Sequence, residues 1–180
     1  MNNKRGNLVE VYSDFLKYCL QEDAHIPDNL NDIDWDELYE FGKKQAILGI
    51  FFYGIKKLPD SVCRPDKSQI FKWYSASLFI ERANKQAYKD AVALTSLFQK
   101  KFGVRSCILK GQTNALMYPD PYMRTPGDID LWTDAKVLDI IRFSRLLDNK
   151  GEIGYHHIEL SYFKTPVEVH FFPSFMGNLA

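Results

Sequence analysis

The sequence predicts an α+β protein, in which a helical N-terminal region precedes an α/β-type core with a mixed β-sheet. Two observations predict this class. Before Gly103, apolar residues recur at helical spacing over long stretches, whereas after it short apolar runs alternate with short helical segments. The 180 residues suffice for one domain with a good core, or for a small domain with a helical appendage.

The composition is that of a globular protein, with 46% hydrophobic and 26% charged residues. Lysine plus arginine and aspartate plus glutamate both total 23, so no net charge attracts the protein to nucleic acid or to anionic membranes. Three widely spaced cysteines, Cys19, Cys63 and Cys107, form no CxxC pattern. This pattern favours reduced thiols in a cytosolic protein over disulfides or a zinc site.

The N-terminal residues contain charges before any apolar stretch that a signal peptide would need. The longest apolar run, Ala46 to Ile55, is about half of the ~20 residues that a membrane span requires. We therefore expect a buried helix at this run, no membrane segment, and a cytoplasmic location.

The first two predicted helices cover residues 8–21 and 34–57, on either side of a Pro-Asp-Asn turn. Asp34 is expected to cap the second helix, because Glu37 follows at the spacing of a capping box. Residues 58–67, with two prolines and scattered polar residues, are expected to be a connector.

A long helix is predicted over residues 68–101, and Gly103 stands where a glycine commonly ends a helix. Its apolar residues follow an imperfect i, i+3/i+4 stripe, which indicates a face packed on the core. The stripe consists of Ile70, Trp73, Leu78, Ala87, Ala91, Leu94 and Phe98.

The elements after Gly103 alternate between short strands and helices. They are predicted as a strand at 104–109, a helix at 112–118, a proline-containing loop at 118–127, a strand at 128–132, a helix at 134–149 capped by Thr133 or Asp134, and strands at 157–164 and 167–172. We expect a helical region at 1–67 and a core at 68–180. Because an α/β sheet usually needs further cover, this core is expected to be incomplete at its C-terminus.

Asp128 and Asp130 are the first candidate functional residues. They flank Ile129 in a strand-like run, so both side chains should lie on one face of the sheet. Two carboxylates on one face repel each other unless a cation lies between them or one takes up a proton. Oxygen ligands of this kind suit a hard divalent ion.

The last two strands add a third carboxylate. If Thr165 and Pro166 form a two-residue link, Phe163 lies opposite Glu168. One face is then apolar and consists of Ile158, Leu160, Tyr162, Val167, Val169 and Phe171; the other consists of His157, Glu159, Ser161, Glu168 and His170. A Glu168 buried in a central strand would need a partner charge or a metal ion.

The other polar residues of these strands leave two readings open. His157 and Glu159 fit an ordinary solvent-exposed strand face equally well. His170 is either a hydrogen-bond donor beside a metal site or a polar residue whose bonds are satisfied within the fold.

Several of these residues together resemble a known family. Leu109-Lys110-Gly111, Tyr118, Arg124, the run from Gly127 to Leu131, and Glu168-Val169-His170 resemble the uncharacterised nucleotidyltransferase family of the DNA polymerase β-like superfamily, over about residues 69 to 173. The resemblance implies a polymerase β-like nucleotidyltransferase fold. It also implies transfer of a nucleoside monophosphate from ATP or another NTP to an acceptor hydroxyl by a two-metal mechanism.

The resemblance also implies roles for individual residues. Asp128, Asp130 and Glu168 would be catalytic and would bind Mg²⁺ or Mn²⁺, while Lys110, Gly111, Gln112 and Arg124 would contact the nucleotide phosphates. Two positions depart from the superfamily pattern, since Gln112 replaces a serine and Glu168 replaces the commoner aspartate.

Other functions fit parts of the pattern. A catalytically silent nucleotide-binding or regulatory module would keep the same fold, an aspartyl-phosphate phosphatase also uses a DxD pair, and the two aspartates could simply cap a turn. For a transferase, the acceptor is unknown. A small molecule or a protein is favoured over RNA, because no basic stripe provides the phosphate contacts that dominate RNA binding.

Overall fold

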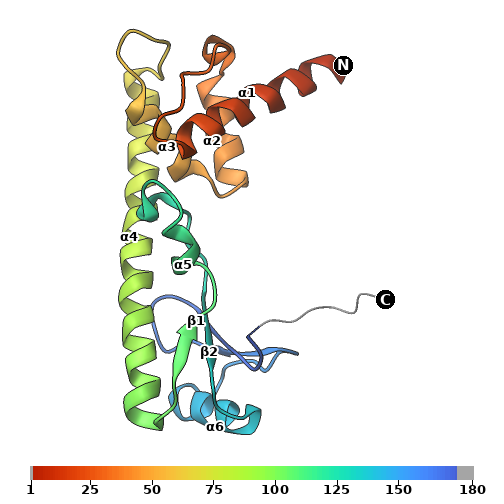
Figure 1. The fold of residues 1–180 in the computed structure, drawn as a ribbon, viewed down its shortest axis with the longest axis vertical. Coiled ribbons are helices and arrows are strands. Elements are labelled where there is room, and N and C mark those ends of the chain that lie inside the picture. The colour runs from red at the N-terminus through yellow and green to blue at the C-terminus, as the bar shows by residue number, and fades with distance from the viewer. Residues whose placement is uncertain (1, 174–180) are drawn as a thin grey trace. The chain divides into compact units, whose positions relative to one another are not determined.

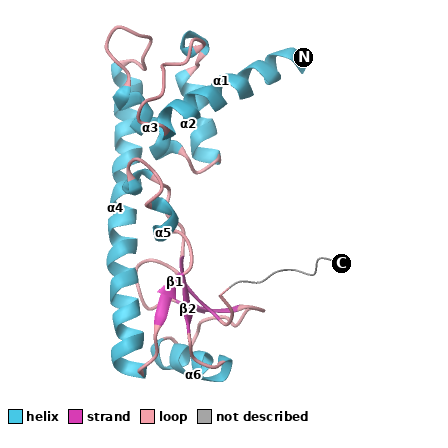
Figure 2. Cartoon of the chain, in the orientation of Figure 1, coloured by secondary structure: helices cyan, strands magenta, loops and turns pink. Residues whose placement is uncertain are grey.

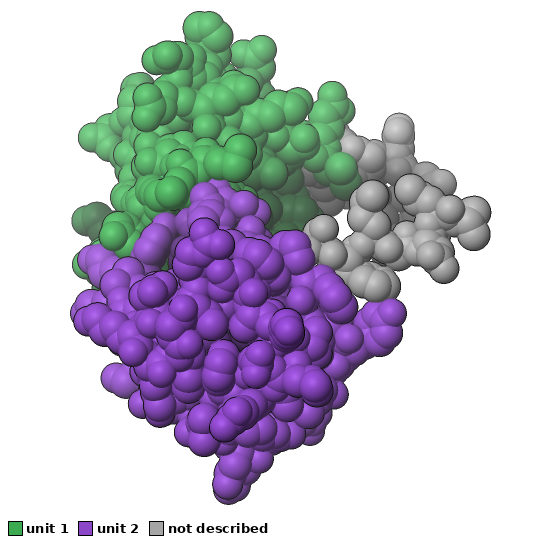
Figure 3. All heavy atoms as spheres, turned by 60° about the horizontal axis from the view of Figure 1, so that its bottom comes forward, with its two compact units in different colours: residues 1–84, 115–125 green, residues 85–114, 126–180 purple. Residues whose placement is uncertain are grey.

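The computed structural model describes residues 2–173 and contains both helices and a mixed sheet (Figure 2), which confirms the predicted α+β class. The chain forms two compact units, coloured separately in Figure 3. The first consists of residues 1–84 and 115–125, and the second of residues 85–114 and 126–180. The division falls within a long helix, and the predicted division at residues 67/68 stays a prediction.

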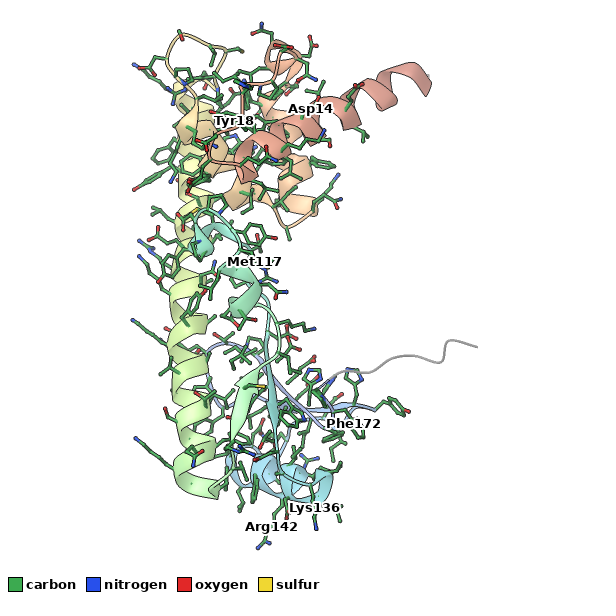
Figure 4. The ribbon with its side chains drawn as sticks, viewed as in Figure 1. Asp14, Tyr18, Met117, Lys136, Arg142 and Phe172 are labelled. Atoms are coloured by element: carbon green, nitrogen blue, oxygen red, sulfur yellow. The ribbon has the colours of Figure 1, made fainter. Side chains whose placement is uncertain are left out.

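The first unit is helical. Its elements are α1 (Asn2–Leu20), η1 (Leu30–Asp32), α2 (Trp35–Lys44), α3 (Leu48–Lys57), the first part of α4 (Lys67–Leu97), and η3 (Pro121–Met123) (Figure 1). An aromatic core holds them together: the Phe51 ring lies 5.8 Å from that of Phe15 and 6.5 Å from that of Trp73. Asp14 and Tyr18, labelled in Figure 4, lie one turn apart on α1.

Asp34 caps α2 as predicted, because its Oδ1 accepts hydrogen bonds from the amides of Asp36 and Glu37, both at 3.0 Å. The prediction of one helix over 34–57 was wrong, since the chain reverses at Ala46, which has a left-handed φ of 58°. The reversal packs α3 closely on α2, where a Cβ at Gly42 would lie 2.9 Å from the Phe51 ring. Burying both sets of apolar side chains requires this turn, and helical periodicity does not reveal it.

The apolar run from Ala46 to Ile55 supplies most of α3, in which seven of ten residues are buried. This confirms the predicted buried helix. Within residues 2–173, no helix combines the length and the apolar character that crossing a membrane requires.

The second unit is built on a four-stranded sheet in the order β1-β2-β4-β3. The strands are β1 (Ser106–Ile108), β2 (Ile129–Thr133), β3 (His157–Leu160) and β4 (Val167–His170). β2 and β4 are parallel neighbours at the centre of the sheet. At the two edges, β1 pairs antiparallel with β2, and β3 pairs antiparallel with β4. The remaining elements are the second part of α4, η2 (Phe98–Phe102), all but the last residue of α5 (Gln112–Ala115), and α6 (Val137–Leu147).

One face of this sheet packs on helical side chains. Buried apolar residues alternate along β2, β3 and β4, as period-two strands require. The core consists of Ala91, Leu94, Phe98, Ile129, Leu131, Ile140, Ile158, Leu160, Val167 and Val169. The polar residues between them, among them Asp130 and Glu168, therefore lie on the other face.

The ends of the helices in this unit confirm one prediction and correct another. Gly103 ends the long helical segment with a left-handed φ of 70°, as predicted. The predicted cap of the next helix was wrong, because α6 begins after Lys136 (labelled in Figure 4), whose side chain makes no cap bond. Asp134 is instead engaged by Arg105, whose backbone N and side-chain Nε donate to its two oxygens at 3.0 and 2.9 Å.

The predicted register of the last two strands was also wrong. β3 ends at Leu160, a loop of residues 161–166 follows, and Glu159 rather than Phe163 lies opposite Glu168. Two carboxylates shape this loop: Asp90 accepts from Thr165 N and Oγ1, at 3.0 and 2.8 Å, and Asp148 accepts from Ser161 N at 2.8 Å.

The observed partner of Glu168 is four residues from the predicted one. Because side chains alternate with a period of two, an even shift keeps each strand residue on its predicted face of the sheet. Tyr162 is the exception. It was expected on the apolar face, but it lies in the loop and is 52% exposed.

Candidate metal and nucleotide site

Asp130 and Glu168 lie side by side on the two central strands. β2 and β4 are parallel, and their register pairs Asp130 directly with Glu168. Asp130 is only 1% exposed, whereas the Glu168 side chain is 26% exposed. The structure therefore brings together a buried and a half-buried carboxylate on the polar face of the sheet.

Lys110 contacts Asp130 and lies within the electrostatic influence of the other two predicted carboxylates. Its Nζ lies 3.2 Å from Asp130 Oδ1, although its side chain is 60% exposed. The hydrogen bond and the charge of Asp130 raise the pKa of Lys110, and the charges of Asp128 and Glu168 raise it further. Asp128, half-buried just before β2, thus acts on the same ammonium group as the other two carboxylates.

His170 is the second partner of Asp130. Its Nε2 lies 2.8 Å from Asp130 Oδ1 and 3.4 Å from Glu168 Oε2. Asp130, Glu168 and His170 offer ligand atoms that all lie within 4.8 Å of one another. Among the described residues, Asp128 is not part of any set of three His, Cys, Asp or Glu side chains whose ligand atoms lie this close together.

This donor set fits the predicted cation. Carboxylate oxygens are the ligands that Mg²⁺ and Mn²⁺ prefer, and Asp130 and Glu168 provide them next to each other. A buried carboxylate without a partner would be costly, and Lys110 and His170 meet that need in the structure. The roles of Asp128, Asp130 and Glu168 as metal ligands stay predictions.

The predicted phosphate-binding residues lie in both units. Gly111 has a left-handed φ of 75°, and a Cβ there would lie 3.7 Å from the Asp128 carbonyl oxygen. Gln112 is 5% exposed, and its side-chain amide has no hydrogen-bond partner within the described part of the chain. Arg124 belongs to the first unit, where Asn84 Nδ2 donates to its carbonyl oxygen at 2.5 Å. Their phosphate contacts stay predictions.

Sequence reasoning missed His156. Its Nε2 lies 3.2 Å from His157 Nδ1, and His157 Nδ1 lies 3.4 Å from Glu168 Oε2. The ligand atoms of His156, His157 and Glu168 form a second group within 4.8 Å of one another. The signal available in the sequence was the His-His pair at the start of β3, opposite the Glu-x-His strand.

Comparison with known proteins supports the chemistry suggested by this site. A family described as an uncharacterised nucleotidyltransferase matches residues 31–174, which include Lys110, Asp128, Asp130 and Glu168. No curated protein and no solved structure matches the chain significantly. The matched segment covers most of the 180 residues. The chain belongs to the uncharacterised nucleotidyltransferase family.

Proposed function

We propose that this protein transfers a nucleoside monophosphate from an NTP to an acceptor hydroxyl, with divalent cations held by Asp128, Asp130 and Glu168. The observation that carries the proposal is the pairing of buried Asp130 with Glu168 on adjacent parallel strands, beside the Lys110 ammonium. Membership of a nucleotidyltransferase family supports the same reaction class.

Two-metal transfer is the mechanism we propose for this site. Mg²⁺ or Mn²⁺ bound by the carboxylates would supply positive charge to the α-phosphate and to the departing pyrophosphate. The acceptor oxygen forms a bond to the α-phosphorus as the bond between the α-phosphorus and its bridging oxygen breaks. The proton of the acceptor hydroxyl would pass to Glu168, whose side chain is 26% exposed and so open to an acceptor.

Lys110 and Gly111 would bind the triphosphate. The Lys110 side chain is largely exposed and would turn from Asp130 to the phosphates once Asp130 ligates a cation. Gly111 carries no side chain and adopts a left-handed φ, so the backbone there allows close approach of a ligand. Gln112 would add a further phosphate contact, whereas Arg124 belongs to the other compact unit and its phosphate contact stays a prediction. A small molecule or a protein is the favoured acceptor.

The reaction is tested by incubating the purified protein with Mg²⁺, a cell extract and each NTP labelled at the α-phosphate. We expect transfer of label to an acceptor, and loss of transfer in Asp130→Asn and Glu168→Gln. Glu152→Gln removes an exposed carboxylate of the same unit and should keep activity. Nucleotide binding without label transfer or pyrophosphate release for any NTP would replace the enzyme with a silent nucleotide-binding module.

A further inference from the structure

Three of the four histidines of the chain gather beside the carboxylate pair. The ring centroids of His156 and His157 lie 4.7 Å apart. The centroid of the His170 ring lies 5.4 Å from that of His156 and 5.7 Å from that of His157. The fourth histidine, His25, belongs to the other compact unit. The role proposed above for the carboxylates does not require His156 or His157.

A bend explains how two sequence neighbours contribute to one cluster. In a regular strand, His156 and His157 would point to opposite faces. His157 starts β3 opposite His170, whereas His156 lies in the bend before the strand and is held there by the Phe171 amide, which donates to its carbonyl at 2.8 Å. His156 is therefore free of strand alternation, and its Nε2 lies 3.2 Å from His157 Nδ1.

Two separations among the donor atoms match those of neighbouring ligands around one metal ion, and all three atoms lie within 4.8 Å of one another. His157 Nδ1 lies 3.2 Å from His156 Nε2 and 3.4 Å from Glu168 Oε2. Zinc–nitrogen bonds of about 2.0–2.1 Å at tetrahedral angles place neighbouring ligands about 3.3 Å apart. The 3.4 Å separation is longer than an ordinary N–H···O hydrogen bond, and the 3.2 Å contact is a hydrogen bond between the two rings that an ion would replace.

Gly154 leaves room for this arrangement. A Cβ at Gly154 would lie 3.1 Å from His157 Nε2, so the ring packs directly on the glycine backbone. The Gly154 amide also donates to the His157 carbonyl at 2.9 Å. With Nε2 against Gly154, the other ring nitrogen faces Glu168. The His157 side chain remains 17% exposed, which leaves a path for an ion from solvent.

We propose that His156 Nε2, His157 Nδ1 and a Glu168 oxygen bind one divalent transition-metal ion of the Zn²⁺ type. Two imidazoles and one carboxylate suit Zn²⁺ and Co²⁺ and disfavour Mg²⁺, which prefers oxygen ligands. Three protein ligands leave a fourth position for water or a substrate group. Because Glu168 also belongs to the carboxylate pair, an ion bound here competes with Mg²⁺ for Glu168.

The metal alone tests the site. We expect the full chain to bind one Co²⁺ ion, with the visible absorption of low-coordinate cobalt, and Zn²⁺ to displace it. His156→Gln and His157→Gln should each weaken Co²⁺ binding at least about tenfold. His25→Gln is the matched control, because His25 is exposed and lies in the other unit. Equal Co²⁺ affinity in wild type, H156Q and H157Q would overturn the proposal.

A second measurement reports on the individual nitrogens and needs no variant. Long-range ¹H–¹⁵N NMR spectra of the imidazoles, recorded with and without Zn²⁺, should show the largest changes at His156 Nε2 and His157 Nδ1. Changes confined to His25, or changes at His157 Nε2 in place of Nδ1, would contradict the assigned ligands.

This proposal and the proposed function can fail separately. Asp130→Asn should abolish Mg²⁺-dependent nucleotide binding and retain Co²⁺ binding, whereas H156Q should retain nucleotide binding and weaken Co²⁺ binding. A wild-type protein that binds nucleotide with Mg²⁺ but does not bind Co²⁺ would overturn the proposed histidine site. It would leave the proposed nucleotidyltransferase function unaffected. Thermal unfolding of each variant without metal checks that the fold is intact.

Discussion

His170 Nε2 lies 2.8 Å from Asp130 Oδ1, across the two parallel strands at the centre of the sheet. The register places His170 opposite Trp132, so the ring reaches back by two residues to meet Asp130. The same oxygen lies 3.2 Å from Lys110 Nζ. Asp130 is thus held in one orientation before any ligand arrives.

A first prediction concerns this orienting bond. His170→Phe should weaken Mg²⁺-dependent nucleotide binding by about tenfold to hundredfold, because partners that orient a ligating carboxylate have effects of this size. Calorimetric titration of nucleotide at several Mg²⁺ concentrations measures it. If His170→Gln restores affinity and His170→Phe does not, the hydrogen bond is responsible rather than the ring's volume.

A second prediction concerns Lys110 and alkaline pH. The Asp130 carboxylate raises the pKa of Lys110 above its usual 10.5. A raised folded-state pKa adds stability that is fully present below the unfolded pKa and is lost as pH rises through the folded value. Lys110→Met should therefore be less stable than wild type at pH 8, and the gap should narrow above about pH 10.5. A gap in urea midpoints that stays constant with pH would rule this out.

A third prediction concerns Asp90 and the loop before β4. Thr165→Val removes the hydroxyl that donates to Asp90 Oδ2 at 2.8 Å. Because hydrogen bonds to a charged group contribute about 1.5–3 kcal/mol, urea unfolding at pH 7 should show a loss of that order. Thr165→Ser keeps the hydroxyl and is the control; an equal loss in both variants would show that the hydroxyl is not what stabilises the loop.

Acid should weaken the same contact. Burial alone would raise the pKa of Asp90, but hydrogen bonds from Thr165 and Gln86 outweigh it, and the pKa falls below 3.8. A lowered folded-state pKa adds stability that is present above the unfolded pKa and is lost as pH falls through the folded value. The difference between wild type and Thr165→Val should thus shrink below about pH 3.8, as urea titrations at pH 3 and pH 7 would show.

A fourth prediction uses the glycine beneath His157. Gly154→Ala adds a Cβ 3.1 Å from His157 Nε2, so the ring must shift and Co²⁺ binding should weaken about tenfold. Gly127→Ala is the matched control, because a Cβ there meets nothing within 4 Å. Equal cobalt affinity in the two alanine variants would show that the position of the His157 ring does not matter.

The sequence was sufficient to predict the faces of the site, but not its exact pairing. Strand alternation placed Asp130 and Glu168 on polar faces, and the parallel pairing of β2 with β4 brings them together. The register of β3 could not be predicted. It depends on a loop held by Asp90, which lies 75 residues from Thr165 in the chain.

The histidine cluster was hidden for a different reason. Alternation predicts that His156 and His157 face opposite ways, and only the bend before β3 brings both rings towards Glu168. The reversal at Ala46 was hidden in a similar way, since a left-handed alanine leaves no signal in hydrophobic spacing. Both features arise from tertiary packing rather than from local preference.

The central claim is that the carboxylates bind nucleotide through a divalent cation, and thermal unfolding with ATP, with and without Mg²⁺, tests it most directly. At a nucleotide concentration 100-fold above Kd, we expect about 2.7 kcal/mol of stabilisation in wild type and in Glu152→Gln. Asp128→Ala and Asp130→Asn should show none, and no variant should respond without the metal. Equal stabilisation of wild type and Asp130→Asn, or stabilisation independent of Mg²⁺, would contradict the account.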